Sequence, residues 1–131
     1  NSLKKELLQP TKIYVNEVLS LCKKNLIQSA ANITGGGIIE NIVRSIPDNL
    51  TANIDLSKIK VKKIFSWIKS KNVSDIEMLR TFNCGVGFCL MIRKRNYKKI
   101  KKYFSKDYFP YEIGYISKGK KKLNLHKKLK W

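Results

Sequence analysis

The stretch Asn32-Ile-Thr-Gly-Gly-Gly-Ile-Ile-Glu-Asn-Ile-Val-Arg44 places three consecutive glycines between two apolar segments. Ile33 predicts a short strand before the glycines, and the apolar residues from Ile38 to Ile46 recur at helical spacing after them. Glycine adopts positive φ readily, and the first N–H groups of a helix lack intrahelical partners and favour an anion. The stretch therefore predicts either an anion-binding loop, to which Thr34 adds a hydroxyl, or a tight strand-to-helix turn without a ligand.

Apolar periodicity gives the remaining elements on either side of this loop. The residues before position 10 form a short helical or irregular lead-in, and Tyr14, Val18, Leu21 and Cys22 predict one apolar face of a helix. The alternation at 50–56 predicts a half-buried strand. Helices are predicted over 11–25, 38–46, 59–71, 75–80 and 97–106, and strands near 33 and over 50–56, 86–93, 111–117 and 123–125. This order predicts an α+β domain in which helices pack against one mixed sheet.

A second polar cluster lies between a predicted helix and a buried strand. Ser74 and Glu77 have the spacing of a capping box, which starts a short helix that ends near Arg80. Glycines inside an apolar segment mark a close approach of the backbone, either to the first loop, to a ligand or to ordinary packing neighbours. The cluster comprises Arg80, Thr81, Asn83, Gly85 and Gly87.

Composition excludes several other classes of protein. The 131 residues suit one domain, and 43% apolar residues suffice for a core without metals or disulfides. Three scattered cysteines indicate a reducing, cytoplasmic location, and His126 is the only histidine, so a zinc site is not expected. Cys84 has no histidine neighbour in the sequence that would activate it as a nucleophile. No apolar run approaches the roughly 20 residues of a membrane span.

The chain carries a formal net charge of +19, with fifteen Lys or Arg residues but only two acids between Arg93 and Trp131. Such a field attracts nucleic acid or phosphates, and a basic nucleic-acid-binding module is one hypothesis. The other interpretation is a lysine-rich background on solvated faces. It is favoured by the predominance of Lys over Arg, because base readout favours Arg. Trp67 and Trp131 are interpreted as anchors of the core and of the tail.

Four collinear segments resemble the phosphoribosylformylglycinamidine cyclo-ligase (AIR synthetase) family in its C-terminal domain. The resemblance runs from Leu7 to about Ile116 and rests on the combination of all four. The segments are Leu7-Leu-Gln-Pro-Thr-Lys-Ile-Tyr-Val15, Ala31–Arg44, Glu77-Met-Leu-Arg-Thr-Phe-Asn-Cys-Gly-Val-Gly87 and Ile113-Gly-Tyr-Ile116.

The resemblance implies the fold, the reaction and the partners. Such enzymes use ATP to phosphorylate the amide oxygen of formylglycinamidine ribonucleotide, and a nitrogen of its amidine side then closes the ring of aminoimidazole ribonucleotide. ADP and phosphate are released in this step of purine biosynthesis. The family works as a homodimer, and ATP and Mg²⁺ bind mainly to an N-terminal domain. Relative to that pattern, this sequence (1–131) lacks the N-terminal domain and the first strand of the C-terminal domain, so a fragment without activity of its own is expected.

The resemblance also assigns the two polar clusters to substrate binding, while the catalytic residues stay unassigned. Asn32 stands where the family usually has His, and Asn forms hydrogen bonds but does not shuttle a proton near neutral pH. Glu40 and Arg44 have the spacing of an ion pair within one helix, which is the alternative to a ligand contact. A related ATP-dependent enzyme of the same superfamily is a third alternative. The expected substrate-binding residues are Asn32, Thr34, Gly35, Gly36, Gly37, Glu40, Asn41, Arg44, Arg80, Thr81, Asn83, Gly85 and Gly87.

Overall fold

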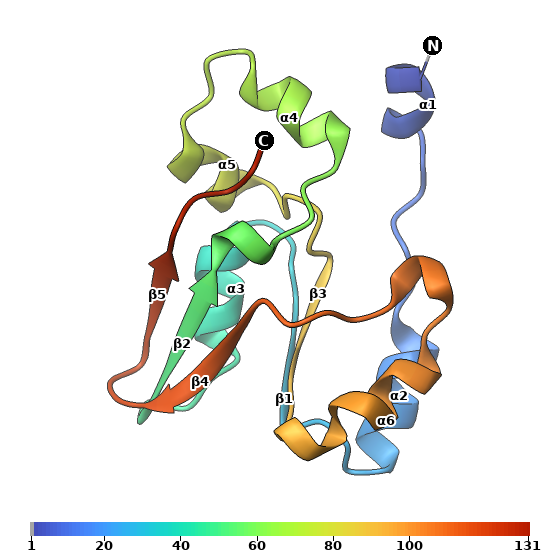
Figure 1. Ribbon diagram of the computed structural model, residues 1–131, viewed down its shortest axis with the longest axis vertical. Helices are drawn as coiled ribbons and strands as arrows, with labels where there is room; N and C mark the ends of the chain where they lie inside the picture. The colour runs from blue at the N-terminus through green and yellow to red at the C-terminus, as the bar shows by residue number, and fades with distance from the viewer. Residues whose placement is uncertain (1) are drawn as a thin grey trace.

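The computed structural model describes residues 2–131, and its helices and strands are shown in Figure 1. The α-helices are α1 (Ser2–Leu7), α2 (Val15–Lys23), α3 (Gly37–Arg44), α4 (Lys63–Lys69), α5 (Asp75–Thr81) and α6 (Tyr97–Ile100). The strands are β1 (Ser29–Asn32), β2 (Leu50–Asp55), β3 (Phe88–Met91), β4 (Gly114–Lys118) and β5 (Lys122–His126). Helices and a mixed sheet in this order confirm the predicted α+β class.

The described strands divide between two sheets, whereas one sheet was expected. β1 pairs antiparallel with β3, and β2 lies between β4, which is antiparallel to it, and β5, which is parallel. At the centre of the three-stranded sheet, the Asn53 side-chain amide donates to the Ser117 hydroxyl at 3.0 Å, and the Asn124 side-chain amide donates to Asn53 Oδ1 at 3.0 Å. These contacts join all three strands through side chains as well as through the backbone.

The core lies between the sheets and α3, α4 and α5. Ile38 and Ile42 project from α3 into it and meet Ala52 and Ile54 of β2, together with Met78 of α5, all of them buried. Ser74 caps α5 as predicted, because its hydroxyl accepts the Glu77 backbone N–H at 3.2 Å, while the Glu77 carboxylate accepts from the Thr81 hydroxyl. A cap of this type contributes ~1 kcal/mol to stability. It fixes where α5 begins, and α5 in turn supports the first turn of α3.

Several sequence-based expectations are wrong in detail. Cys22 is exposed and does not share the buried side of α2 with Leu21. Trp67 lies on the outer side of α4 with 44% of its surface exposed, so it is not a core anchor, whereas Trp131 is half-buried and donates its indole N–H to Asp75. Strand β2 is buried along Thr51–Ile54 instead of half-buried, and its polar side chains find partners there: Thr51 donates to the Lys120 carbonyl in the β4–β5 turn, and Asn53 donates to Ser117 of β4.

The helix predicted over 97–106 is also shorter than expected. It stops at Ile100 and continues as a 3₁₀ turn over Lys101–Tyr103. The helix predicted over 59–71 begins only at Lys63, after a 3₁₀ turn at Leu56–Lys58. Across residues 2–131 no helix is both long and apolar enough to cross a membrane.

Candidate functional site

The glycine loop connects β1 to α3 through two left-handed residues. Gly36 has φ +90° and Gly37 has φ +58°, conformations that side chains other than glycine rarely adopt. The Asn41 amide nitrogen lies within 3.3 Å of the Thr34 carbonyl, 3.1 Å of the Gly35 carbonyl and 2.8 Å of the Gly37 carbonyl. Asn41 therefore holds the loop in shape from within α3, and a contact of Asn41 with a ligand stays a prediction.

The two polar clusters predicted from the sequence lie next to each other. The Ile33 N–H donates to the Gly87 carbonyl at 3.0 Å, which continues the β1–β3 ladder up to the glycine loop. A Cβ at Gly37 would overlap the Leu79 carbonyl oxygen, so α3 starts in direct contact with the backbone of α5. The loop at 34–37 and the segment at 80–87 thus form one continuous surface at the end of the two-stranded sheet.

Glu40 and Arg44 form an ion pair at 2.6 Å on the exposed side of α3. The Glu40 carboxylate also folds back over Gly36. A Cβ added at Gly36 would lie 2.5 Å from the Oε2 atom of Glu40. A negative charge therefore already occupies the space above the α3 N-terminus. An incoming phosphate would be repelled there unless Glu40 moved, so the geometry favours a group that donates hydrogen bonds to this carboxylate.

The second cluster is shaped mainly by its own hydrogen bonds. The Asn83 side chain accepts the Gly85 backbone N–H at 2.9 Å, and the Thr81 hydroxyl donates to Glu77 at 3.1 Å. Gly85 has φ +102° and packs against the Lys60 backbone, so its close approach is to that segment and not to the first loop. Arg80 is exposed beside them.

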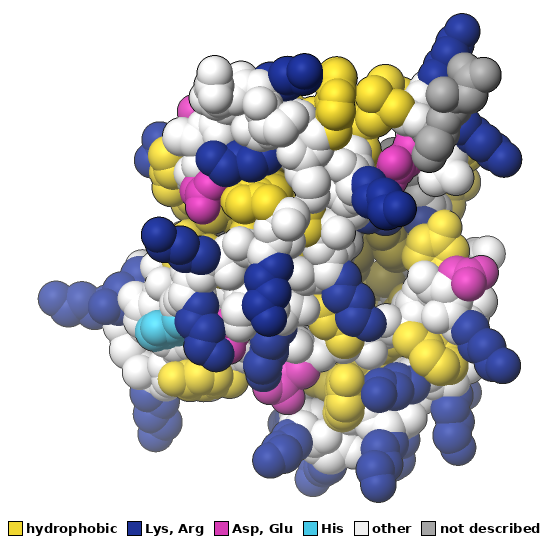
Figure 2. All heavy atoms as spheres, turned by 45° about the horizontal axis from the view of Figure 1, so that its top comes forward, with side chains coloured by type: hydrophobic (Ala, Val, Ile, Leu, Met, Phe, Trp, Pro, Cys, Tyr) yellow, Lys and Arg dark blue, Asp and Glu magenta, His cyan; other side chains and the backbone are white. Residues whose placement is uncertain are grey.

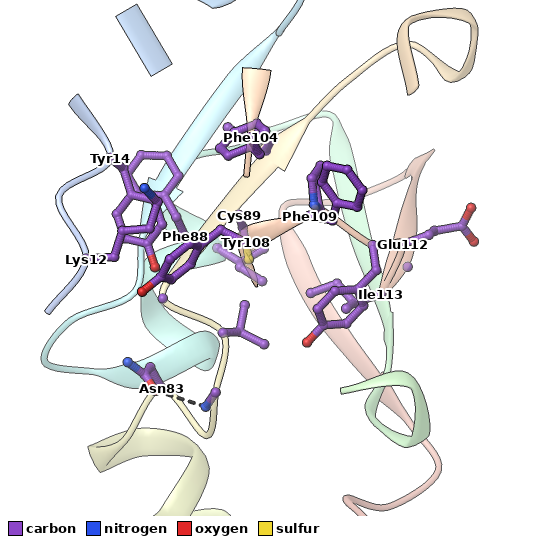
Figure 3. Close-up of a pocket in the computed structure, with 18 of the residues that line it drawn as sticks. Lys12, Tyr14, Asn83, Phe88, Cys89, Phe104, Tyr108, Phe109, Glu112 and Ile113 are labelled. Carbon is purple, nitrogen blue, oxygen red and sulfur yellow. Dashed lines mark hydrogen bonds between the residues drawn. The ribbon is translucent and has the colours of Figure 1, made fainter. Parts of the chain in front are cut away.

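A cavity of about 960 Å³ opens next to this surface (Figure 3). Asn83, Gly85 and Gly87 line it, and Asn32 lines a smaller, adjoining hollow of about 380 Å³. The other predicted site residues line neither space. These are Thr34, Gly35, Gly36, Gly37, Glu40, Asn41, Arg44, Arg80 and Thr81. Four of the predicted site residues therefore line the two spaces, and the others lie on the surface beside them.

Sequence reasoning did not include Lys12 and Tyr14 among the substrate-binding residues, but both line the cavity and the smaller hollow. The Lys12 ammonium pairs with Glu17 at 2.6 Å and lies 4.5 Å from the centre of the Tyr108 ring. The hydrogen bond from Lys12 lowers the pKa of Glu17, and burial raises the pKa of the Tyr14 phenol. Both residues lie in the Leu7–Val15 segment that resembles the cyclo-ligase family. That resemblance was the one feature of the sequence that could have indicated their place beside the cavity.

Metal-binding chemistry finds no support in the described part of the chain. Residues 2–131 contain no group of three or more His, Cys, Asp or Glu side chains that could hold a metal ion. Burial raises the pKa of the Cys84 thiol to about 11 and that of the Cys89 thiol to about 12, so neither is a thiolate at neutral pH. Both side chains pack in the hydrophobic core.

Basic side chains are spread over the face shown in Figure 2 and do not gather in one stripe. Among the described residues, the basic side chains that form ion pairs are Lys12, Arg44, Lys58, Lys69, Lys121 and Lys127. On this face the distribution is typical of solvated charge.

Comparison with known proteins identifies relatives over most of the chain. It is 44% identical over 116 residues to a phosphoribosylformylglycinamidine cyclo-ligase of Ligilactobacillus salivarius, covering 87% of this chain and 34% of that protein. It is 44% identical over 95 residues to the bifunctional purine biosynthetic protein ADE5,7 of Saccharomyces cerevisiae, covering 72% of this chain and 12% of that one. A trifunctional purine biosynthetic protein adenosine-3 of Chironomus tentans is 41% identical over 98 residues, covering 74% of this chain and 7% of that protein.

The chain thus spans about a third of the length of the cyclo-ligase relatives that it matches. Residues 1–125 also match the family described as AIR synthase related protein, C-terminal domain. That match covers nearly the whole chain, including the glycine loop and the segment at 80–87 packed beside it. The chain therefore belongs to the AIR synthase related protein family, as a C-terminal domain of that family.

Proposed function

We propose that this chain forms one wall of the active site of a phosphoribosylformylglycinamidine cyclo-ligase, in the carboxy-terminal domain of that enzyme. One observation carries the proposal: the loop at Thr34–Gly37 and the segment at Arg80–Gly87 form a continuous surface beside an open cavity. Both segments lie within the stretch that matches named cyclo-ligases, and within the stretch that matches the family.

The proposed reaction starts from formylglycinamidine ribonucleotide and ATP. Transfer of a phosphoryl group to the amide oxygen makes that oxygen a leaving group, and the amidine nitrogen then closes the imidazole ring. ADP, phosphate and aminoimidazole ribonucleotide leave. In this proposal ATP and Mg²⁺ are held mainly by the N-terminal domain of the complete enzyme, as the family resemblance implies. The reaction would take place in the cytoplasm, in a homodimer.

Within this scheme the residues of this chain orient the ribonucleotide. The exposed Thr34 hydroxyl in the glycine loop and the exposed Glu40 carboxylate in the first turn of α3 offer a donor and an acceptor. Asn32, at the rim of the smaller hollow, adds an amide that both donates and accepts. Because an amide does not titrate near pH 7, Asn32 binds substrate in this proposal and moves no proton.

A chimeric enzyme tests the proposal. The segment of the Ligilactobacillus salivarius cyclo-ligase that aligns with this chain is replaced by this chain, and turnover of formylglycinamidine ribonucleotide is measured. We expect turnover by the chimera and none by the 131-residue chain alone. A folded chimera that binds ATP but does not turn over the substrate would contradict the proposal.

A further inference from the structure

A strap of residues 127–131 follows β5 and crosses the start of α5. Figure 1 shows it in dark red, running from the end of β5 past α5 toward α4. The stretch that matches the family covers residues 1–125, so the strap lies outside it. Family membership therefore says nothing about what the strap does, and its contacts have to be read from the structure.

The strap is attached to the rest of the domain along its length. The Lys127 ammonium pairs with the Asp55 carboxylate at 2.7 Å, at the end of β2. Leu129 is buried and belongs to the same core cluster as Met78 of α5, and Trp131 packs against that cluster. A segment anchored at successive positions follows one course, so it can hold in place the element that it touches.

The strap touches α5 at Asp75, the first residue of the helix. The Trp131 indole N–H donates to Asp75 Oδ1 at 3.2 Å, and the Lys69 ammonium of α4 lies 2.9 Å from the same oxygen. Lys69 also donates to the Val73 carbonyl at 2.7 Å and lies 6.0 Å from the centre of the Trp131 ring. One carboxylate thus joins α4, α5 and the strap.

Helix α5 carries part of the second polar cluster at its other end. The helix has seven residues, so it is about 10 Å long. Arg80 and Thr81 are its last two residues, and beside them the Leu79 carbonyl is in contact with Gly37 of α3. Contacts at both ends of a short helix fix its direction as well as its place. The bond to Asp75 therefore helps to set where the cluster lies relative to the glycine loop.

We propose that Trp131 is a positioning residue of the cyclo-ligase site, which orients α5 through Asp75 so that the segment at 80–87 meets the ribonucleotide. This inference rests on the proposed function. Trp131 lines neither the cavity nor the smaller hollow, so it acts through α5 and not on the substrate. A displacement of about 1 Å by a change far from the reacting atoms can reduce turnover about a hundredfold. A loosened α5 is therefore expected to weaken substrate binding.

The chimeric cyclo-ligase tests this with Trp131→Phe, which keeps an aromatic ring against the core and removes the N–H donor. Trp67→Phe is the matched control, because Trp67 lies on the outer side of α4. We expect Trp131→Phe to raise the KM for formylglycinamidine ribonucleotide about 3- to 10-fold, with kcat changed less than about twofold and the KM for ATP unchanged. The control should leave all three unchanged. An unchanged KM in Trp131→Phe, or an equal rise in both variants, would overturn the inference.

The acceptor side of the bond provides a conservative variant. Asp75→Asn keeps an Oδ1 acceptor for the Trp131 indole, so its KM for the ribonucleotide should stay within about twofold of the parent chimera. Asp75→Leu has no acceptor and should raise this KM as much as Trp131→Phe does. If both Asp75 variants raise it equally, the bond to Trp131 does not position α5.

Hydrogen exchange in the 131-residue chain tests the same contact without turnover. The Met78 N–H donates to the Ser74 carbonyl at 3.0 Å and the Phe82 N–H to the Met78 carbonyl at 2.9 Å, so these two amides report on both ends of α5. In Trp131→Phe their exchange should accelerate about fivefold, while that of Ala52 in β2 should change less than about twofold. Equal acceleration at Ala52 would show a general loss of stability and overturn the inference. The selective result together with a chimera that lacks turnover would support the hold on α5 and contradict only the proposed function.

Discussion

Gly37 lies in contact with the Leu79 carbonyl, so that the first turn of α3 rests on the backbone of α5. No side chain larger than hydrogen fits between them, and Gly37 also has a left-handed φ of +58°. This contact holds together the two polar clusters that the sequence separates by more than thirty residues. It therefore decides whether the proposed active-site wall exists as one surface.

Gly37→Ala should destabilise the chain by about 2–4 kcal/mol, because it adds backbone strain and displaces α5. Gly35→Ala is the matched control, since nothing lies within 4 Å of a Cβ at that position and its φ is not left-handed. We expect the control to change stability by less than about 0.5 kcal/mol. Urea unfolding of both variants measures the difference, and equal stabilities would disprove the contact.

Asn41→Asp should cost about 1–3 kcal/mol, because it replaces a donor that faces three carbonyls with an acceptor. Asn41→Gln keeps the amide but moves it by one methylene, and it should recover only part of this loss. Thermal unfolding of both variants provides the measurement. An Asp variant as stable as the parent would mean that the loop does not depend on Asn41.

Thiol reactivity should separate Cys22 from the two buried cysteines. Cys22 is exposed, while burial raises the pKa of Cys84 to about 11 and that of Cys89 to about 12. At pH 8, one thiol should react with a chromogenic disulfide within minutes and all three should react in denaturant. In Cys22→Ser the rapid phase should vanish. A rapid phase that survives in this variant would contradict the buried positions.

Asp55 should contribute to stability above pH 4 and lose that contribution as the pH falls toward 2. Hydrogen bonds from Lys127 and Ser57 lower the pKa of its carboxyl to about 2, whereas an unfolded Asp titrates near ~3.9. Lys127→Met should therefore lower the melting temperature at pH 6 and have little effect at pH 2. Lys130→Met is the control because Lys130 lies in none of the ion pairs described above. Equal effects of Lys127→Met at both pH values would contradict a stabilising contact between Lys127 and the ionised Asp55 carboxylate.

Local signals in the sequence were sufficient for most elements but not for their assembly. The glycines before Ile38 and the pairing of Ser74 with Glu77 are short-range patterns, and both mark the helix starts seen in the structure. The division of the strands between two sheets depends on long-range pairing that periodicity does not contain. The positions of Lys12 and Tyr14 beside the cavity also depend on tertiary packing, so only their motif indicated them.

The interpretation of the glycine loop changed most. As a sequence it predicted an anion site or a plain turn, but the structure places the Glu40 carboxylate over Gly36 and uses Asn41 to brace the loop. Side-chain rotamers of this kind follow from the packing of α3 against α5. Sequence spacing did predict the Glu40–Arg44 pair, because residues four apart on a helix are neighbours.

The central claim is that the surface around Thr34 contacts the ribonucleotide, and the kinetics of the chimeric cyclo-ligase test it most directly. Thr34→Val keeps the shape of the side chain and removes its hydroxyl, so kcat/KM for formylglycinamidine ribonucleotide should fall about 5- to 30-fold with an unchanged melting temperature. Ser20→Ala in α2 is the control and should leave kcat/KM unchanged, because Ser20 lines neither hollow and its hydroxyl bonds the Asn16 carbonyl within the helix. If Thr34→Val has the same kcat/KM as the parent chimera, the glycine loop does not form a wall of the active site.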